Sequence, residues 1–505
     1  MGCISNTWYS FKVNGAISGF FPGKSGIRQG DPLCPYLFVL SMEILSRSLR
    51  RLCSQPRVSY HPKCSRLNIT HLIFADDLMI FVRGDVPSVN AVKKAISEFA
   101  LISGLHANIE KTNIYFGGVP HSIMQEILDA TGFSLGNFPF RYLGLPLATS
   151  KLKISMFDSL VTKIQKCIHH WSSHALSYAG RAQLLNSVIF GLDNFWCSSL
   201  LLPKEVIHHI NKLSKDFFWN IPVGTRRLVF KNWSTICAPW SYGGFNIKDL
   251  LSWNQALWVW KLSLPNTGLW AHWIKTYVLK QESIWTVISK EQFPSCFKDI
   301  LKTRDIFVSL SGSAQQAQLQ LNAWCAGSHI PANQLYLFFR QITPVGDWAT
   351  SLTYSGIMPS HRIISSMAVQ GQLATVDNLQ RRGFSLANRC CLCENHEETH
   401  AHLFFSCPYS HHVWLFVLQW MNVIRPVLPL QQELTLLDTM PSWRKHWFQV
   451  SIATVVHSLW TERNHKIFAQ EQLSPSALLK KIKFKIAVRM HMRHSELFLS
   501  SLQSV

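Results

Sequence analysis

Two adjacent aspartates, Asp76 and Asp77, are the first residues whose type and spacing could do chemistry. They separate two short apolar runs, residues 72–75 and 78–81, and this pattern predicts a β-hairpin with the carboxylates at its turn. Carboxylates among apolar residues are costly to desolvate unless a cation compensates them. Hard Mg²⁺ takes carboxylate oxygens and bridges substrate phosphates, so the pair is a candidate magnesium site. The alternative is two exposed aspartates in an ordinary turn.

A second group of potential ligands combines three thiols with an imidazole. Its members follow the spacing C-x₂-C-x₈-H-x₄-C: Cys390, Cys393, His402 and Cys407. These ligand types suit tetrahedral Zn²⁺, and a site closed by four protein ligands is structural rather than catalytic. Cys391 and His400 lie in the same stretch and remain alternative ligands.

A glycine-containing segment, residues 25–38, is the third candidate. It reads Ser-Gly-Ile-Arg-Gln-Gly-Asp-Pro-Leu-Cys-Pro-Tyr-Leu-Phe. Gly30 permits close approach of the backbone to a ligand. Arg28 can bind a phosphate, and Gln29 can hydrogen-bond a base or a sugar. Taken alone, the segment is a loop that precedes a helix.

The elements that must position these residues form a mixed α/β pattern. Apolar residues at helical spacing predict a helix over 36–52, and a second helix runs from about Ser88, after Pro87, to a stop at Gly104. Tyr115 and Phe116 indicate a further strand. Strands that alternate with helices and pair in antiparallel fashion predict an α+β fold rather than a doubly wound sheet.

Tryptophan content separates the first segment from the second. No tryptophan occurs from residue 9 to residue 170, whereas eleven lie between Trp171 and Trp285. The second segment, about 149–310, is predicted to be mostly helical, with these tryptophans as core anchors. Residues 311–318, Ser-Gly-Ser-Ala-Gln-Gln-Ala-Gln, are the candidate linker.

Several of these motifs together resemble the reverse transcriptases of LINE-type (non-LTR) retrotransposons, especially the plant lineage. The resemblance begins with Arg-Gln-Gly-Asp-Pro-Leu at 28–33 and Phe-Ala-Asp-Asp at 74–77. It extends over nearly the whole chain, through residues 103–112, 140–147, 179–185, 217–219, 243–245, 372–384 and 460–464. The order of the motifs makes the resemblance specific.

The resemblance implies a fold and a division into domains. Residues 1–148 are expected to form a truncated reverse-transcriptase palm, an antiparallel sheet with helices, and residues 149–334 a mostly helical thumb and connection. A small zinc-binding module is expected at 335–425, followed by a basic helical tail at 426–505.

The resemblance also implies an activity, RNA-directed DNA synthesis, and roles for particular residues. Asp76 and Asp77 match the catalytic hairpin, with Asp76 the expected ligand of Mg²⁺ or Mn²⁺. Lys111 matches a lysine placed near the nucleotide phosphates. Arg28, Gln29 and Gly30 match the motif that positions template and nucleotide. The Cys/His group matches a zinc-binding module downstream of these enzymes.

One departure from the family pattern bears on catalysis. The family takes a further catalytic aspartate from a strand upstream of residue 28, but residues 1–30 contain neither aspartate nor glutamate. The fingers and that aspartate are therefore expected to be missing and the chain to be inactive alone, so whether it is an enzyme stays open. The alternative is a non-catalytic nucleic-acid-binding or interaction protein that uses the zinc module.

Composition narrows the partners and the compartment. Lys and Arg total 49 and Asp and Glu total 28, a formal charge of +21, which favours RNA and DNA as partners. No apolar run reaches 18 residues and no signal peptide is evident, so we expect no membrane contact and an intracellular protein, nuclear or cytoplasmic, that is not secreted. The 13 cysteines suit a reducing compartment.

Overall fold

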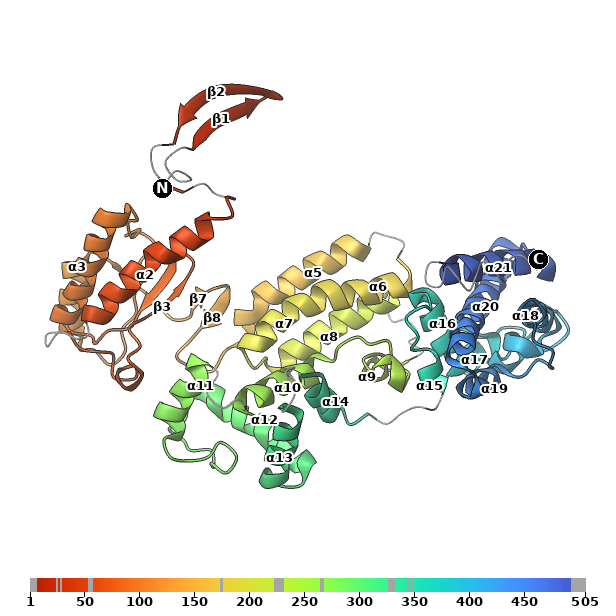
Figure 1. Ribbon diagram of the computed structural model, residues 1–505. Coiled ribbons are helices and arrows are strands. Elements are labelled where there is room, and N and C mark those ends of the chain that lie inside the picture. The colour runs from red at the N-terminus through yellow and green to blue at the C-terminus, as the bar shows by residue number, and fades with distance from the viewer. Residues whose placement is uncertain are drawn as a thin grey trace. The chain divides into compact units, whose positions relative to one another are not determined.

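The computed structural model (Figure 1) describes residues 7–491 except 24–25, 28–29, 53–57, 173–175, 222–230, 264–267, 326–331, 343–345 and 347. The chain forms two compact units. The first comprises Met1–Thr149 and Asn266–Ser283, and the second comprises Ser150–Pro265 and Ile284–Val505. Among the described residues, every helix is too short or too polar to cross a bilayer.

The first unit combines short strands with helices, as an α+β fold requires. Its strands are β1 (Trp8–Val13), β2 (Ala16–Pro22), β3 (His71–Phe74), β4 (Asp77–Ile80), β5 (Asn113–Ile114), β6 (Ser134–Leu135), β7 (Phe140–Tyr142) and β8 (Leu145–Leu147). Its helices are α2 (Cys34–Leu52), η1 (Ser65–Leu67), α3 (Val86–Ser103), α4 (His121–Thr131), α11 (Leu269–Trp273) and η5 (Ile274–Leu279). The described strands pair two by two: β1 with β2, β3 with β4, and β7 with β8 antiparallel, and β5 with β6 parallel.

The helices α2 and α3 cover one face of the β3–β4 hairpin. Their apolar stripes form one cluster, Met42, Leu45, Leu49, Ala95 and Phe99, against which Ile73, Leu78 and Ile80 pack. A hydrogen bond between Ser46 Oγ and His71 Nε2, 2.9 Å long, also joins α2 to β3. One face of the hairpin therefore packs on the apolar core that α2 and α3 form.

Both predicted helices of this unit are confirmed, and local signals explain their ends. The carboxylate of Asp85 accepts a hydrogen bond from the Ser88 N–H at 2.9 Å and so caps α3, with Pro87 in the first turn. Gly104 ends the helix with φ of 72°, a left-handed conformation that favours glycine.

The strand predicted at Tyr115 and Phe116 is displaced. β5 covers only Asn113–Ile114 and pairs in parallel with β6, although we expected antiparallel pairing. Tyr115 instead stacks on Phe140, with ring centroids 4.0 Å apart. The Tyr115 side chain that suggested a strand thus packs against β7 instead. A contact between residues so far apart in the sequence cannot be predicted from a local pattern.

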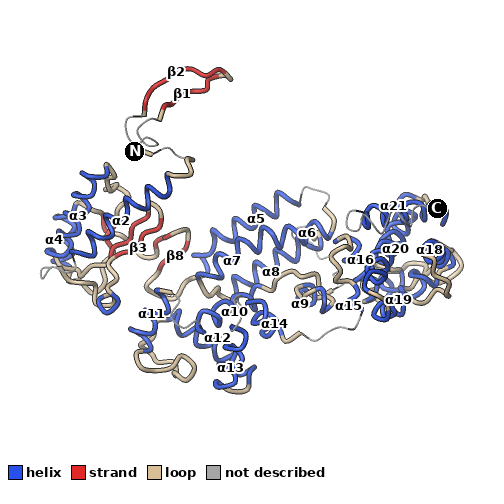
Figure 2. The backbone as a smooth tube through the Cα atoms, in the orientation of Figure 1, coloured by secondary structure: helices blue, strands red, loops and turns tan. Residues whose placement is uncertain are grey.

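The second unit is helical, as predicted for residues 149–310. Figure 2 shows helices and loops, and no strand, among the described residues after β8. Its first helices are η2 (Ile154–Phe157), α5 (Asp158–Ser172), α6 (Tyr178–Leu184), η3 (Leu185–Ile189), α7 (Phe190–Ser199), α8 (Lys204–Trp219), α9 (Trp233–Ile236), η4 (Trp240–Tyr242), α10 (Leu250–Ser263), α12 (Ser295–Ser311), α13 (Ala314–Cys325) and α14 (Ala332–Arg340). Helices α10, α12, α13 and α14 share one core, which contains Val259, Phe307, Leu321 and Leu335.

The linker predicted at residues 311–318 is wrong. Ser311 ends α12, Gly312 turns the chain with φ of 88°, and α13 begins at Ala314. Ala317 is fully buried in the helical core. Alanine and glutamine are good helix formers, so a segment that looks like a linker by composition folds as a helical hairpin once Leu321 has a core to enter.

The remaining helices enclose the Cys/His segment. They are α15 (Trp348–Ser351), α16 (Pro359–Val369), α17 (Val376–Gln380), η6 (His402–Ser406), α18 (Pro408–Trp420), α19 (Leu430–Thr435), η7 (Leu436–Thr439), α20 (Ser442–Ala469) and α21 (Pro475–His491). Helix α20 packs against α16, α18 and α21, as can be followed in Figure 1. Its central residues are almost wholly buried, so α20 is the central helix of this part of the unit.

Candidate functional site

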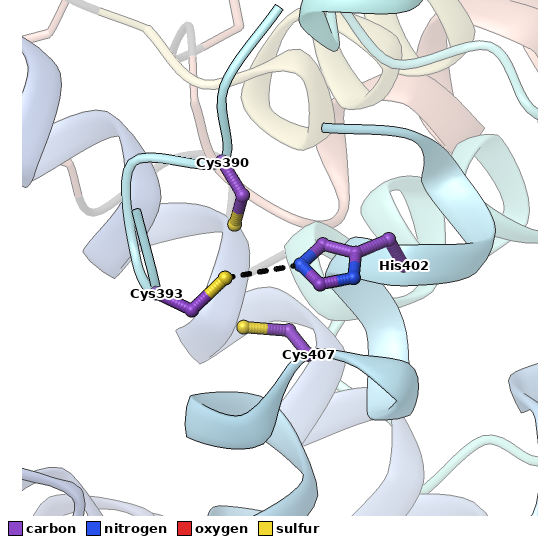
Figure 3. A group of neighbouring side chains, drawn as sticks. All are labelled: Cys390, Cys393, His402 and Cys407. Atoms are coloured by element: carbon purple, nitrogen blue, oxygen red, sulfur yellow. Dashed lines mark hydrogen bonds between the residues drawn. The ribbon is translucent and has the colours of Figure 1, made fainter. Parts of the chain in front are cut away.

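The Cys/His group converges in space. The donor atoms of its four members, Cys390, Cys393, His402 and Cys407, all lie within 4.8 Å of one another. Figure 3 shows the four side chains pointing toward one another, with Cys393 Sγ 3.3 Å from His402 Nε2. Three sulfurs and one imidazole nitrogen at such separations can surround a single tetrahedral Zn²⁺ ion.

Two tight backbone turns place these ligands. The Cys390 N–H donates to His396 O at 2.8 Å, and the Glu394 N–H donates to Cys390 O at 2.7 Å, with Glu394 at φ of 60°. This turn presents Cys390 and Cys393 on one side. The Cys407 N–H donates to His402 O at 2.6 Å, so η6, which begins at His402 and ends just before Cys407, brings the other two candidate ligands together.

The pKa shifts within the cluster run in both directions. Cys407 precedes the first turn of α18, and its pKa is lowered, chiefly by the hydrogen bond from Cys390 and further by the backbone N–H groups of Tyr409 and Ser410. The same thiol–thiol hydrogen bond, followed by burial, raises the pKa of Cys390. Burial, and then the nearby His396, lower the pKa of His402, which keeps its imidazole neutral. Zinc binds thiolates and neutral imidazoles, so the shifts of Cys407 and His402 lie in the direction of the zinc-binding forms and that of Cys390 does not.

The two alternative ligands are engaged elsewhere. The ring of His400 accepts from the Leu373 N–H at 3.0 Å and contacts Thr375 Oγ1 at 3.1 Å. The Cys391 thiol points toward Glu398 and the Arg463 carbonyl, at 3.9 and 3.8 Å. Neither side chain belongs to the group of four. In the fold, the four residues of the C-x₂-C-x₈-H-x₄-C spacing converge, and Cys391 and His400 lie outside their group.

The sequence did not predict the buried ion pair between Glu398 and Arg463. Glu398 is fully buried, and its carboxylate accepts from Arg463 Nη2 at 2.6 Å and from Nε at 3.3 Å. Glu398 Oε1 also accepts from the Val376 N–H at 3.0 Å. The pair therefore joins the ligand loop to α17 and to α20. Glu398 and Arg463 both lie in stretches that resemble the family, but no sequence pattern paired them.

Replacing Arg463 by methionine should destabilise the second unit by about 3–5 kcal/mol, because the Glu398 carboxylate would stay buried without its partner. We would measure the denaturant midpoint of the full chain with zinc bound, by tryptophan fluorescence. Arg381→Met is the matched control, since Arg381 pairs with Asp377 while remaining 70% exposed, and such pairs contribute about 1 kcal/mol or less. Equal midpoints for the two variants would contradict the structural role of Arg463.

The aspartate hairpin forms as the sequence predicts. Strands β3 and β4 pair with Phe74 opposite Asp77, which leaves Ala75 and Asp76 as the two turn residues. Ala75 has φ of 50°, a left-handed conformation that is strained for a residue with a side chain. Ile73 and Leu78 face α2 and α3, so alternation places Asp77 on the opposite face of the hairpin.

The expectation that apolar neighbours enclose these carboxylates is wrong. Asp76 and Asp77 are exposed, and Phe74 is 62% exposed. The reason is geometric, because α2 and α3 cover the other face and the turn projects beyond them. A ligand can therefore reach both carboxylates. In the free chain they stay hydrated, so folding does not desolvate them.

The other predicted palm residues are only partly described. Arg28 and Gln29 lie outside the described residues. Gly30 has φ of 91° with open space where a Cβ would be. Lys111 is exposed, its backbone N–H 3.2 Å from Asn108 Oδ1, and within the described part of the chain no hydrogen bond or ion pair joins its side chain to Asp76 or Asp77.

One further residue lies within the electrostatic reach of the hairpin. Tyr142, in β7, has a raised pKa, mainly through burial and then through the negative charge of Asp77. The β7–β8 hairpin and the aspartate hairpin are thus neighbours within the first unit. Sequence reasoning assigned residues 140–147 to the family pattern but did not connect them with Asp77.

Comparison with known families accounts for both groups. Residues 2–147 match the reverse transcriptase (RNA-dependent DNA polymerase) family, and they include the aspartate hairpin, Gly30 and Lys111. Residues 332–414 match the segment described as zinc-binding in reverse transcriptase, and they include all four Cys/His ligands. The chain is thus similar to reverse transcriptases over two segments, and the zinc-binding segment lies downstream of the polymerase segment, as the order of the motifs predicts.

Individual relatives agree with a retroelement origin. A retrovirus-related Pol polyprotein from the type-1 retrotransposable element R2 of Popillia japonica is 28% identical over 158 residues, 30% of this chain and 25% of that protein. A putative ribonuclease H protein of Arabidopsis thaliana is 24% identical over 194 residues, 36% of this chain and 31% of that protein. An uncharacterized mitochondrial protein of the same plant is 46% identical over 77 residues, 15% of this chain and 62% of that protein. The chain therefore spans less than two thirds of each of these relatives, and the matches fit the plant LINE-type resemblance.

Proposed function

We propose that this chain supplies the palm and the downstream nucleic-acid-binding parts of a retroelement RNA-directed DNA polymerase. The observation that carries the proposal is the exposed Asp76–Asp77 turn of the β3–β4 hairpin, within the reverse transcriptase match. In this proposal residues 1–148 form the partial palm and 149–334 the thumb and connection. Residues 335–425 form the zinc module, and 426–505 the basic tail.

The site residues of the palm receive roles from this proposal. The aspartate hairpin would help hold two divalent ions, Mg²⁺ or Mn²⁺, of which one would supply activation of the primer 3′-hydroxyl and the other stabilisation of the leaving pyrophosphate. Asp76 in the turn is the proposed direct ligand, and Asp77, on the face away from α2, plays the lesser part. Lys111 is proposed to contact the nucleotide phosphates, and Arg28, Gln29 and Gly30 to position template and nucleotide.

The cluster of Cys390, Cys393, His402 and Cys407 is proposed to hold one structural zinc ion. Its four donors already converge, and Glu398 and Arg463 support the loop that carries them. Zinc there would organise a small fold that contacts nucleic acid, with Arg381, Arg382 and Arg389 near it in the chain. An intracellular location, nuclear or cytoplasmic, stays a prediction.

A second function, non-catalytic nucleic-acid binding, is favoured by one observation. Residues 1–30 contain no carboxylate that could complete a two-metal site with Asp76. Acting by itself, this polypeptide would then bind RNA or DNA, or interact through the zinc module, without extending a primer. Binding and extension assays separate the two functions.

Nucleic-acid binding should be strongly salt-dependent and nearly independent of sequence, because the +21 charge implies contacts with phosphates. About five such contacts on a single strand would weaken binding roughly 100-fold between 50 and 200 mM salt. Fluorescence anisotropy with labelled RNA and DNA oligonucleotides of two unrelated sequences would measure this. A flat salt response, or no binding at 50 mM salt, would contradict the proposed role in nucleic-acid binding.

A further inference from the structure

Helix α21 presents two different faces. Its buried residues recur every fourth position and pack toward α18 and α20: Leu478, Ile482, Ile486 and Met490. The residues that we call the α21 lysine face are exposed on the other side: Lys480, Lys481, Phe484 and Lys485. Because these four are three to five positions apart or adjacent, they form one continuous strip on the helix surface.

The α21 lysine face carries positive charge without counter-charge. Residues 475–491 contain no aspartate or glutamate. In the part of the chain that the structure describes, its three lysines form no ion pair with a carboxylate. Elsewhere in this unit, by contrast, Lys302 pairs with Asp299 at 2.8 Å. The absence of counter-ions makes the strip a surface that an anion would stabilise.

The positive charge of the α21 lysine face contributes to lowered pKa values of neighbouring groups. The pKa of Lys485 is lowered by burial and then by the charge of Lys481. His361 and His457 lie 4.3 Å apart between ring centroids, with pKa values lowered to about 3 and about 4. Burial is the main cause for both, and the charge of Lys485 contributes to each. Arg489 adds a further cation, and its Nε donates to the Gly356 carbonyl at 2.7 Å.

Phe484 distinguishes this strip from an ordinary solvated lysine face. Its side chain is 70% exposed, whereas Ile482 and Ile486, two positions away on either side, are fully buried. Lys480 and Lys481 lie one turn before it and Lys485 directly after it. An exposed ring flanked by lysines is the arrangement that binds a strand by stacking on a base while cations contact the phosphates.

We propose that the α21 lysine face binds single-stranded nucleic acid, with Phe484 stacked on one base and the three lysines on adjacent phosphates. This inference rests on the proposed nucleic-acid function and names a surface for it outside the palm and the zinc ligands. A membrane is a poorer fit, because an interfacial helix inserts its apolar face and that face of α21 is already buried against α18 and α20.

Phe484→Ala in the full chain tests the stacking contact. Binding of 20-nucleotide oligo(dT) and oligo(U) should weaken about fivefold or more, and binding of a 20-base-pair duplex less than twofold, because a paired base has no free face for the ring. Phe468→Ala is the matched control, since Phe468 is 83% exposed at the end of α20. This control should bind all three probes as the unmodified chain does.

Lys480→Gln, Lys481→Gln and Lys485→Gln, combined in one chain, test the phosphate contacts. The slope of log affinity against log salt should fall by about 2 for a single strand that loses three contacts. The matched control combines Lys290→Gln, Lys298→Gln and Lys302→Gln, which removes the same charge from another part of the unit. Its slope should change by less than 1.

The outcomes separate the inference from the function on which it rests. If the unmodified chain binds no oligonucleotide at low salt, the proposed nucleic-acid function fails. If it binds but Phe484→Ala and the lysine variant match their controls, only the α21 lysine face is rejected. The face is also rejected if these variants lose binding to phosphatidylserine-containing vesicles while their oligonucleotide affinities stay unchanged.

Discussion

Replacing Cys407 by serine is expected to abolish zinc binding by the full chain and to destabilise the helices around the cluster. The four donors lie within 4.8 Å of one another, so one ion can bridge two loops that come together only in the folded state. Structural zinc contributes about 10–16 kcal/mol of apparent binding free energy in small zinc-finger folds. Cys407 and Cys390 are fully buried, so metal loss would leave buried thiols without the partner that compensates them.

The measurement is metal content per chain in purified, reduced protein, together with a thermal unfolding curve. We expect about one zinc in the unmodified chain and none in Cys407→Ser, with a lower melting temperature for the variant. Cys391→Ser is the matched control, because Cys391 is adjacent in sequence to a ligand but lies outside the group of four. A folded chain without zinc, or equal zinc content in Cys407→Ser, would overturn the assignment.

The second large effect concerns catalysis. The polypeptide of residues 1–505, expressed alone, is expected to show no detectable extension of a primer on an RNA template with Mg²⁺ or Mn²⁺. Two-metal chemistry requires carboxylates from separate elements, and Asp76 and Asp77 belong to one hairpin. A site without a second supporting carboxylate loses positioning and charge stabilisation, each of which contributes about 10²-fold or more in rate, so we expect no measurable product.

The decisive comparison is between this chain and a longer polypeptide that adds a fingers region and the first palm strand at the N-terminus. The longer form should extend the primer, Asp76→Ala should abolish that extension, and Asp129→Ala should leave it unchanged. Asp129 is exposed on α4 and bonds only Gln125 within the described residues. Extension by residues 1–505 alone that disappears with Asp76→Ala would refute the prediction.

Local structure could be predicted from the sequence because its causes are local. The β3–β4 hairpin follows from two apolar runs around Asp76 and Asp77, and α3 follows from Pro87 at its start and Gly104 at its end. The spacing of Cys390, Cys393, His402 and Cys407 likewise indicated a tetrahedral site before any fold was known. These signals depend on hydrogen bonds and side chains within a few residues of each other.

Burial and partner choice were decided by the tertiary structure. The sequence could not show that Asp76 is exposed, because that depends on α2 and α3 covering only one face of the hairpin. The prediction of a linker at 311–318 was wrong for the same reason. The core in which Leu321 is buried is formed with other helices, which a local pattern does not include.

The zinc ligands show the division most clearly. The sequence by itself determined that a cluster of cysteines and histidines exists and left six candidates for four places. Only the folded chain engages His400 with Leu373 and turns Cys391 toward Glu398, whose charge is balanced by Arg463, 65 residues away. Ligand types and spacing are properties of a short segment, whereas a buried charge must find its partner wherever the packed chain brings one within hydrogen-bond distance.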